Sequence, residues 1–432
     1  EHARALLMYR FRRLDEARRR AREAGFEGAM FPWQSASSGR EETPEAHLNP
    51  HSGHWLPDHS RLPRHVNAAI AHTGVRYRGA TADQDFLSFN GAELMVEIAR
   101  FWASAATYDH IEDRYEIRGV VGPDEYHEAL PGADHPGVDN NAYTNVMAAW
   151  VLWKTGEILD RLDDHRREEI VAKLAITADE RQRWKELSRR MRVCFHDGVI
   201  SQFEGYEELE ELDWDAYRSR YGNIQRLDRI LEAEGDTANR YRLSKQADVL
   251  MLFYLFSWTE VVELFGRLGY TLDDEMIDRT IDYYLARTSN GSTLSQVVHA
   301  WVAARRDLGQ STFEEPALRG RRLTSDRRPV GLGRLRTPIE SAQHLGAAVA
   351  LGQDPLRVHN LLPRAVSRGV KVDPGGEAVA GLGVELHADI AHASHEILVP
   401  GRAVVAVARR LQQEPELFPR LPAIPRQHSA DA

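Results

Sequence analysis

Apolar residues recur along much of this chain at the three- and four-residue spacing of an amphipathic helix. Residues 3–24 give the first example, in which many arginines and glutamates separate the apolar positions. These positions are Leu7, Phe11, Leu14, Ala17 and Ala21. The same spacing predicts further helices at residues 64–74, 91–106, 141–161, 178–192, 243–267, 274–286 and 293–306. The pattern therefore predicts a mainly α protein.

Long segments without this period separate the predicted helices. Residues 31–62, 109–140 and 195–225 are rich in glycine, proline, asparagine and aromatic residues. Long ordered loops on a helical scaffold usually carry function, so we expect the site to be built from these segments. Successive helices with elaborated loops fit an α-hairpin toroid, although the period alone predicts only the mainly α class.

The densest group of polar residues stands in the second of these segments. Residues 122–127 read Gly-Pro-Asp-Glu-Tyr-His, and the Gly-Pro pair predicts a turn that leaves the acids on a loop. Residues 140–145 read Asn-Asn-Ala-Tyr-Thr-Asn and lead into a predicted helix. A carboxylic acid on a loop, followed by amides at a helix start, is suited to protonating and holding a polyhydroxylated substrate.

Two polar segments near predicted helix starts are further candidates. Lys245 and Gln246 could clamp vicinal sugar hydroxyls, or form a solvated first turn, with Asp248 pairing with Lys245 or capping the helix. Residues 288–293 read Thr-Ser-Asn-Gly-Ser-Thr, which suits phosphate binding at a helix N-terminus or plain N-capping. His299, on the helix that follows, is either a core histidine or an anion contact.

An aromatic segment lies near the start of the chain. Residues 31–34 read Phe-Pro-Trp-Gln, and Trp33 is suited to stacking on a glucose ring or to packing at the rim of a site.

These motifs together resemble the catalytic region of glycoside hydrolase family 65, the maltose, trehalose and kojibiose phosphorylases with some hydrolases. In chain order they are Phe31–Ser35 with Gly39–Glu42, Gly122–His127 with Val138–Asn145, Lys245–Asp248 and Thr288–Ser295. The resemblance implies a six-hairpin (α/α)6 toroid, of which residues 1–316 form an incomplete catalytic barrel. It also implies that a β-sandwich domain and the first barrel helices precede residue 1 in such proteins.

The resemblance assigns Glu125 as the general acid of an inverting reaction on an α-glucoside. A phosphate nucleophile is already charged and needs no catalytic base, so one acid beside an anion site predicts a phosphorylase that yields β-glucose 1-phosphate. The predicted substrate contacts are Trp33, Asn141, Lys245 and Gln246. The predicted phosphate contacts are Ser289, Ser292, Thr293 and His299. The partners are then a disaccharide and inorganic phosphate as co-substrate, with no cofactor, and the resemblance implies a homodimer.

Two alternatives stay open. A trehalose- or maltose-type hydrolase would need a second carboxylate opposite Glu125, for which Glu41, Glu42 and Glu204 are candidates. The other alternative is an inactive, carbohydrate-binding remnant of a truncated gene.

Composition narrows the class of protein further. A net charge of −10 argues against nucleic acid or an anionic membrane as the main partner. The single cysteine, Cys194, cannot form an internal disulfide, which favours the cytoplasm. No apolar run reaches the length of a membrane-spanning helix, and the 19 histidines show no metal-ligand spacing, so no metal is expected.

The last quarter of the chain differs in composition. All nine tryptophans and all fourteen tyrosines stand at or before Trp301. Between Arg319 and Arg336 there are seven arginines and no lysine. We therefore expect residues 317–432 to be an atypical, poorly ordered tail, arising from a change of reading frame near Ala317 or from divergence.

Overall fold

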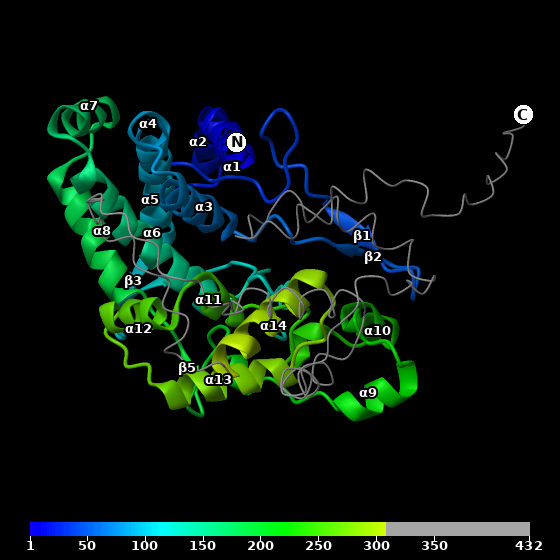
Figure 1. Ribbon diagram of the computed structural model, residues 1–432. Coiled ribbons are helices and arrows are strands. Elements are labelled where there is room, and N and C mark those ends of the chain that lie inside the picture. The colour runs from blue at the N-terminus through cyan, green and yellow to red at the C-terminus, as the bar shows by residue number, and fades with distance from the viewer. Residues whose placement is uncertain (308–432) are drawn as a thin grey trace, which may run out of the picture.

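The computed structural model describes residues 1–307, and this part of the chain is mainly α as predicted (Figure 1). Its longer helices are α1 (His2–Phe11), α2 (Leu14–Glu23), α3 (Val66–Thr81), α5 (Ala92–Ala105), α6 (Ala142–Arg161), α7 (Asp164–Leu174), α8 (Ala178–Arg190), α12 (Trp258–Arg267), α13 (Asp274–Ala286) and α14 (Thr293–Asp307). The shorter ones are α4 (Gln84–Phe86), α9 (Trp214–Tyr221), α10 (Leu227–Ala233) and α11 (Leu250–Leu255). The predicted tail, residues 317–432, lies outside the described residues.

Helix α6 stands at the centre of the core. It packs against α3, α5 and α8, and the four helices lie side by side in Figure 1. Most residues of α5 and α6 are buried, because both helices are apolar around most of their circumference. Asn141 caps α6 by accepting a hydrogen bond from the Thr144 amide at 2.9 Å. The start of α6 is thereby fixed directly after the polar loop that contains Glu125.

Short hairpins decorate this helical scaffold. Strands β1 (Ala46–Leu48) and β2 (Trp55–Pro57) pair antiparallel, as do β3 (Ala106–Asp109) and β4 (Arg114–Ile117), and β5 (Phe195–His196) and β6 (Val199–Ile200). All three hairpins fall in or beside the segments predicted to be loops. The second hairpin is followed by residues 118–141, which carry the candidate acid.

Most predicted helices match observed ones, but two were wrongly drawn as continuous. The predicted helix at 3–24 is broken at Arg13, whose backbone leaves the helical region and whose guanidinium donates to the Ser37 carbonyl at 2.7 Å. The predicted helix at 243–267 is broken twice. Residues 243–249 are irregular because they pair with a distant segment, and the extended Phe256 separates α11 from α12.

Helix α7 was missed by the sequence pattern. Only Ile170 of α7 is buried, so its apolar period is too weak to recognise.

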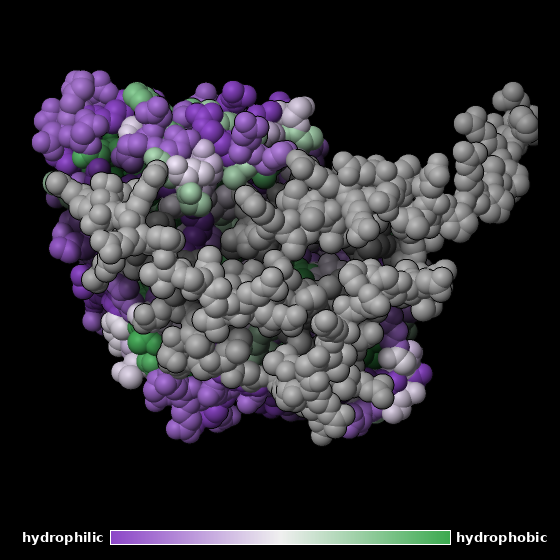
Figure 2. All heavy atoms as spheres, viewed as in Figure 1, coloured by the Kyte–Doolittle hydropathy of each residue, from purple (hydrophilic) through white to green (hydrophobic). Residues whose placement is uncertain are grey.

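The described surface is largely hydrophilic where α7, α1 and α2 face solvent (Figures 1 and 2). Both α2 and α7 carry charged residues at most positions, which accounts for this surface. None of the described helices combines the length and the apolarity needed to cross a bilayer.

The break before α12 is enforced by a capping box. Ser257 accepts a hydrogen bond from the Glu260 amide at 3.2 Å, and Glu260 accepts one from the Ser257 amide at 2.8 Å. We therefore expect Ser257→Ala to lower the free energy of unfolding by about 1 kcal/mol in urea titrations. The exposed Ser219, inside α9, is the matched control and should change it by less than about 0.5 kcal/mol on replacement by alanine. Equal effects of the two substitutions would contradict this account of the break.

Candidate active site

Glu125 lies on the loop between β4 and α6, in an unusual backbone conformation. Its φ of 64° is in the left-handed region, which few non-glycine residues adopt. Its amide donates to the Gly122 carbonyl at 3.3 Å, which closes the turn through Pro123. A strained acidic residue held in a tight turn is a frequent feature of functional sites.

The Glu125 carboxylate contacts both members of the predicted Lys-Gln pair. Lys245 Nζ donates to Glu125 Oε2 at 2.5 Å, and Gln246 Nε2 donates to Glu125 Oε1 at 3.0 Å. Gln246 Nε2 also donates to the Pro123 carbonyl at 2.6 Å. The side chains of Glu125 and Lys245 keep 29% and 20% of their accessible surface. Three residues separated by about 120 positions therefore meet at one partly exposed point.

Backbone pairing with the Thr-Ser-Asn-Gly segment holds Lys245 in place. The Ser244 amide donates to the Arg287 carbonyl at 2.9 Å, and the Ser289 amide returns a bond to the Ser244 carbonyl at 2.8 Å. The Gly291 amide donates to the Lys245 carbonyl at 2.8 Å. These bonds explain why residues 244–245 are not helical, because their peptide groups are already paired.

Gly291 is required by this approach. A Cβ at this position would lie 2.4 Å from the Gln225 carbonyl oxygen, too close for any side chain. The polar loop before α14 is thus packed directly against the chain on either side of Lys245.

A buried hydrogen-bond network supports the loop from below. Asp124 Oδ1 accepts from the Tyr126 amide at 2.6 Å, and Asp124 Oδ2 lies 2.8 Å from His127 Nδ1. Gln202 Nε2 donates to the same carboxylate, and Gln202 Oε1 accepts from Ser244 Oγ at 2.9 Å. Gln202 therefore connects the acid-bearing loop to the strand-like segment that carries Lys245.

Asp248 forms the deepest layer of this support. Its carboxylate accepts from Asn141 Nδ2 at 3.1 Å and from the Asp124 amide at 3.4 Å. Complete burial, together with the negative charge of Asp124, raises the pKa of Asp248 well above its usual value, so its carboxyl group is favoured in the neutral form. The prediction that Asp248 pairs with Lys245 or caps a helix was wrong, because Lys245 bonds to Glu125 and α11 begins without a side-chain cap.

Asn141 also lies behind the site. It is fully buried, and its amide is occupied by the Thr144 amide, the Gln202 carbonyl and Asp248. This differs from the direct substrate contact predicted for it. Its contribution is to hold Asp248 and the start of α6 in place.

The four predicted phosphate contacts separate into two groups. Ser289 Oγ lies 3.0 Å from the hydroxyl of Tyr126, the residue that follows Glu125. Ser292 and Thr293 stand at the start of α14, partly buried and exposed respectively. His299 is buried inside α14 beside Ser295, and burial lowers the pKa of His299 to about 4. The imidazole is then neutral at physiological pH, so the interpretation as a core histidine fits its surroundings.

Trp33 reaches the catalytic segment through a histidine. Its ring packs edge-on against His65, with the ring centroids 5.2 Å apart. His65 in turn packs against Tyr143 of α6 and interacts with the Val121 backbone. The aromatic loop therefore stands beside the segment that leads into the Gly122–Pro123 turn.

Sequence reasoning assigned no firm role to Gln202 and did not single out His127. Both are polar residues inside loops, and neither stands in a local pattern that sets it apart from solvated loop residues. Their function depends on partners 78 and 3 positions away that only the fold brings together. Within residues 1–307, no three side chains of His, Cys, Asp or Glu gather as metal ligands do.

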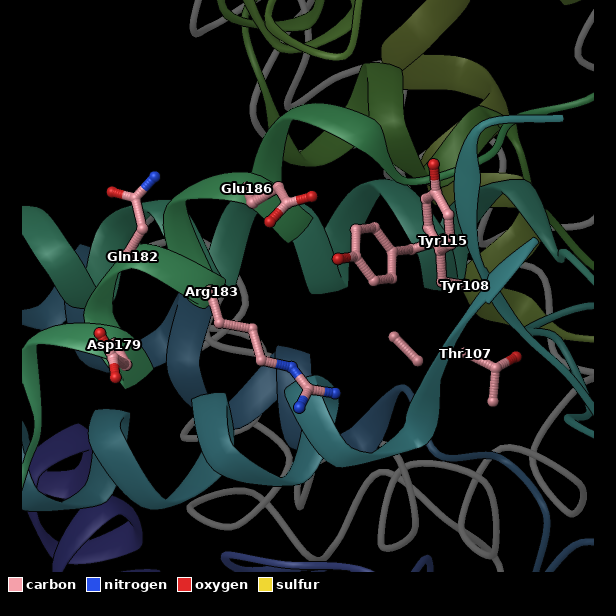
Figure 3. Close-up of a pocket in the computed structure, with 8 residues that line it drawn as sticks. Thr107, Tyr108, Tyr115, Asp179, Gln182, Arg183 and Glu186 are labelled. Atoms are coloured by element: carbon pink, nitrogen blue, oxygen red, sulfur yellow. The ribbon is translucent and has the colours of Figure 1, made fainter. Parts of the chain in front are cut away.

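A separate surface depression of about 620 Å³ lies between the β3–β4 hairpin and α8 (Figure 3). Tyr108 and Tyr115 of the hairpin and Arg183 and Glu186 of α8 are among its lining residues. It shares no lining residue with the surroundings of Glu125, so we do not identify it with the candidate active site.

Gly122 is expected to be intolerant of any side chain. A Cβ there would lie 2.3 Å from Asp248 Oδ2 and 2.5 Å from Asn141 Nδ2, both of which are held by other bonds. Gly122→Ala should lower the free energy of unfolding by about 1–3 kcal/mol, measured by urea denaturation. The control is Gly156→Ala in α6, where nothing lies within 4 Å and where alanine should raise stability by about 0.5–1 kcal/mol. A neutral effect at Gly122 would disprove the close packing described here.

Glu128 should make stability depend on pH. Burial, reinforced by the charge of Asp58, raises the pKa of Glu128 to about 7 from 4.5. The folded state therefore holds this proton more tightly, and the stabilisation that is complete below pH 4.5 is lost as pH rises through 7. The free energy of unfolding of Glu128→Gln should gain on that of the parent by roughly 2–3 kcal/mol between pH 4.5 and 7.5. The exposed Glu45→Gln is the control, and a constant difference across this range for Glu128→Gln would refute the expectation.

Comparison with known proteins identifies the family. The model of the glycosyl hydrolase family 65 central catalytic domain matches residues 1–315, close to the position where the composition changes. An uncharacterized glycosyl hydrolase of Mycobacterium tuberculosis is 59% identical over 303 residues, which are 70% of this chain and 23% of that protein. Trehalose 6-phosphate phosphorylase of Lactococcus lactis is 40% identical over 326 residues, covering 73% of this chain and 39% of the relative.

A solved structure supports the same fold. The protein described as "Putative kojibiose phosphorylase from human microbiome" matches with a TM-score of 0.56 at 24% identity, over 71% of this chain and 40% of that one. The chain thus spans between about a quarter and two fifths of the length of the curated relatives above. Its described residues form part of an (α/α)6 toroid, and the chain belongs to glycosyl hydrolase family 65.

Proposed function

We propose that this chain carries the catalytic centre of an inverting α-glucoside phosphorylase, with Glu125 as the general acid. The observation that carries the proposal is the meeting of Glu125, Lys245 and Gln246 beside the hydroxyl-rich loop before α14. Family membership supports a glycoside-cleaving reaction, and phosphorylases among the relatives favour phosphate as the nucleophile.

The reaction needs one proton transfer and one displacement. A phosphate oxygen attacks the anomeric carbon from the face opposite the leaving group, and the bond from that carbon to the bridging oxygen breaks. Glu125 gives its proton to the bridging oxygen, so the second sugar leaves as a neutral alcohol. The products are β-glucose 1-phosphate and the free acceptor sugar, and the carboxylate recovers its proton afterwards.

Lys245 links phosphate binding to the protonation of Glu125. In the ligand-free arrangement both Glu125 oxygens accept bonds from a cation and an amide, which suits the ionised carboxylate. A phosphate anion bound at the Ser289 loop would compete for the Lys245 ammonium. Loss of that ion pair favours the protonated acid, so phosphate both supplies the nucleophile and prepares the proton donor.

The candidates for a hydrolytic base are otherwise engaged. Glu41 pairs with Arg20 at 2.5 Å and accepts from two backbone amides. Glu204 accepts from Asn140 at 2.8 Å and pairs with Arg192 at 3.1 Å. Glu42 is exposed. A hydrolase would need a carboxylate free to activate water, so these contacts favour the phosphorylase over the hydrolase.

The substrate class follows from the relatives. One is named for trehalose 6-phosphate and the solved structure for kojibiose, which are both disaccharides with an α-linked glucose. We propose an α-glucoside of this size as the substrate, with inorganic phosphate as co-substrate and Trp33 packing against a sugar ring.

The proposal predicts strict dependence on phosphate. The full-length protein should release β-glucose 1-phosphate from α-linked disaccharides, identified by its anomeric proton in NMR, only when phosphate is present. Glu125→Gln should lower this rate about 10³-fold, because the amide cannot donate the proton. The exposed Glu45→Gln should leave it unchanged.

Other outcomes separate the alternatives. Release of free glucose without phosphate would point to a hydrolase. Binding of disaccharide without any cleavage by the parent protein would point to an inactive remnant.

A further inference from the structure

Arg64 is a buried guanidinium without an acidic partner. Within residues 1–307 no carboxylate forms an ion pair with Arg64, and its Nη1 donates to the Arg61 carbonyl at 3.2 Å. Burial, with the positive charges of Arg20 and Arg61, lowers the pKa of Arg64 to about 10 against the opposing effect of Glu41. Buried charges in proteins are normally paired, so this arrangement leaves positive charge uncompensated.

The one nearby acid is already committed. Glu41 receives Arg20 Nη2 at 2.5 Å, the Trp33 and Gln34 amides at 3.1 Å each, and Thr43 Oγ1 at 2.5 Å. Four donors occupy its two oxygens. The group formed by Arg20, Arg61 and Arg64, called here the arginine cluster, therefore keeps an excess of two positive charges over Glu41.

The arginine cluster borders the candidate active site. The Leu62 carbonyl, between Arg61 and Arg64, accepts a hydrogen bond from the Val121 amide at 3.3 Å. The next residue after Arg64 is His65, whose ring contacts both Trp33 and the Val121 backbone. The cluster thus lies between the aromatic loop and the segment that leads to Glu125.

A phosphate ester has the chemistry that this cluster lacks. Guanidinium groups bind phosphate through paired, charge-assisted hydrogen bonds, and arginine is preferred where such an anion is partly desolvated. Free phosphate and a phosphorylated sugar share this chemistry. The attacking phosphate belongs with Lys245 and Ser289 in the proposed function, on different segments of the chain. An anion at the arginine cluster is therefore best supplied by the sugar.

We propose that the arginine cluster binds the phosphate group of a phosphorylated sugar, with Arg64 as the principal contact. The inference rests on the proposed function and specifies its substrate as a phosphate monoester of the acceptor sugar. Arg20 is fixed by Glu41 and the Phe31 carbonyl, 2.7 Å away, and provides charge rather than a mobile side chain. Arg61 is exposed and can close over the anion.

Direct binding tests this inference apart from catalysis. Calorimetry on the full-length protein would compare glucose 6-phosphate, mannose 6-phosphate and glycerol 3-phosphate with glucose, mannose and glycerol. At least one phosphorylated ligand should bind about tenfold or more tightly than its unphosphorylated counterpart, and Arg64→Gln should abolish that difference. Arg61→Gln, at an exposed position that cannot disturb folding, should weaken the same ligand about threefold. The exposed Arg22→Gln is the matched control and should have no effect.

The outcomes distinguish the sources of the anion and the two proposals. Equal affinity for all phosphorylated and unphosphorylated pairs would overturn the inference. So would a loss, in Arg64→Gln, of affinity for inorganic phosphate alone. Selective binding of a phosphorylated sugar by a protein that cleaves no disaccharide would uphold the inference about the cluster while the proposed function failed.

Discussion

The site depends on one buried contact, the carboxyl group of Asp248 lodged beneath the Gly122–Pro123 turn. Asp248 accepts bonds from Asn141 and from the Asp124 amide, and its Oδ2 fills the space where a side chain on residue 122 would lie. Burying this group costs free energy, which neutralisation and hydrogen bonding reduce. The turn in turn sets the left-handed backbone of Glu125. A deep structural carboxyl therefore determines where the proposed acid points.

A second layer of control comes from pairing between distant segments. Ser244 and Lys245 bond through their backbones to residues 287–291, while Gln202 bonds through its side chain to both Ser244 and Asp124. No single helix holds the site. Instead, three loops brace one another on a scaffold centred on α6, and each loop would be free to move if its partners were displaced. Proximity effects in catalysis require such mutual restraint.

This arrangement explains which features the sequence could predict. The helix at 274–286 matched α13, and that at 141–161 matched α6 within one residue, because both are long, periodic and capped locally. The break at 243–249 was missed because the backbone groups there are satisfied by a segment more than 40 residues away. Local periodicity carries no record of such a pairing.

The site was accessible in the same uneven way. The contact of Glu125 with Lys245 and Gln246 fits the roles implied by family resemblance, although those roles stay predictions. The support by Gln202 and Asp248 could not be anticipated, because a buried polar residue in a loop looks like a solvated one until its partners are known. The assignment of Asn141 as a sugar contact shows the same difficulty from the other side.

The electrostatics on the two sides of the catalytic segment suggest how one acid could suffice. On one side, Lys245 neutralises Glu125, so an arriving anion can exchange partners with it without adding net charge to the site. On the other, Glu41 neutralises Arg20 and simultaneously fixes the backbone of Trp33 and Gln34, which leaves Arg64 in want of an anion. A carboxylate base placed on that side would be drawn into an ion pair with the arginines and lose its basicity. Positive charge on both flanks therefore works against activating water and in favour of binding anions, which is the distribution expected where phosphate, rather than a protein carboxylate, brings the negative charge to the reaction.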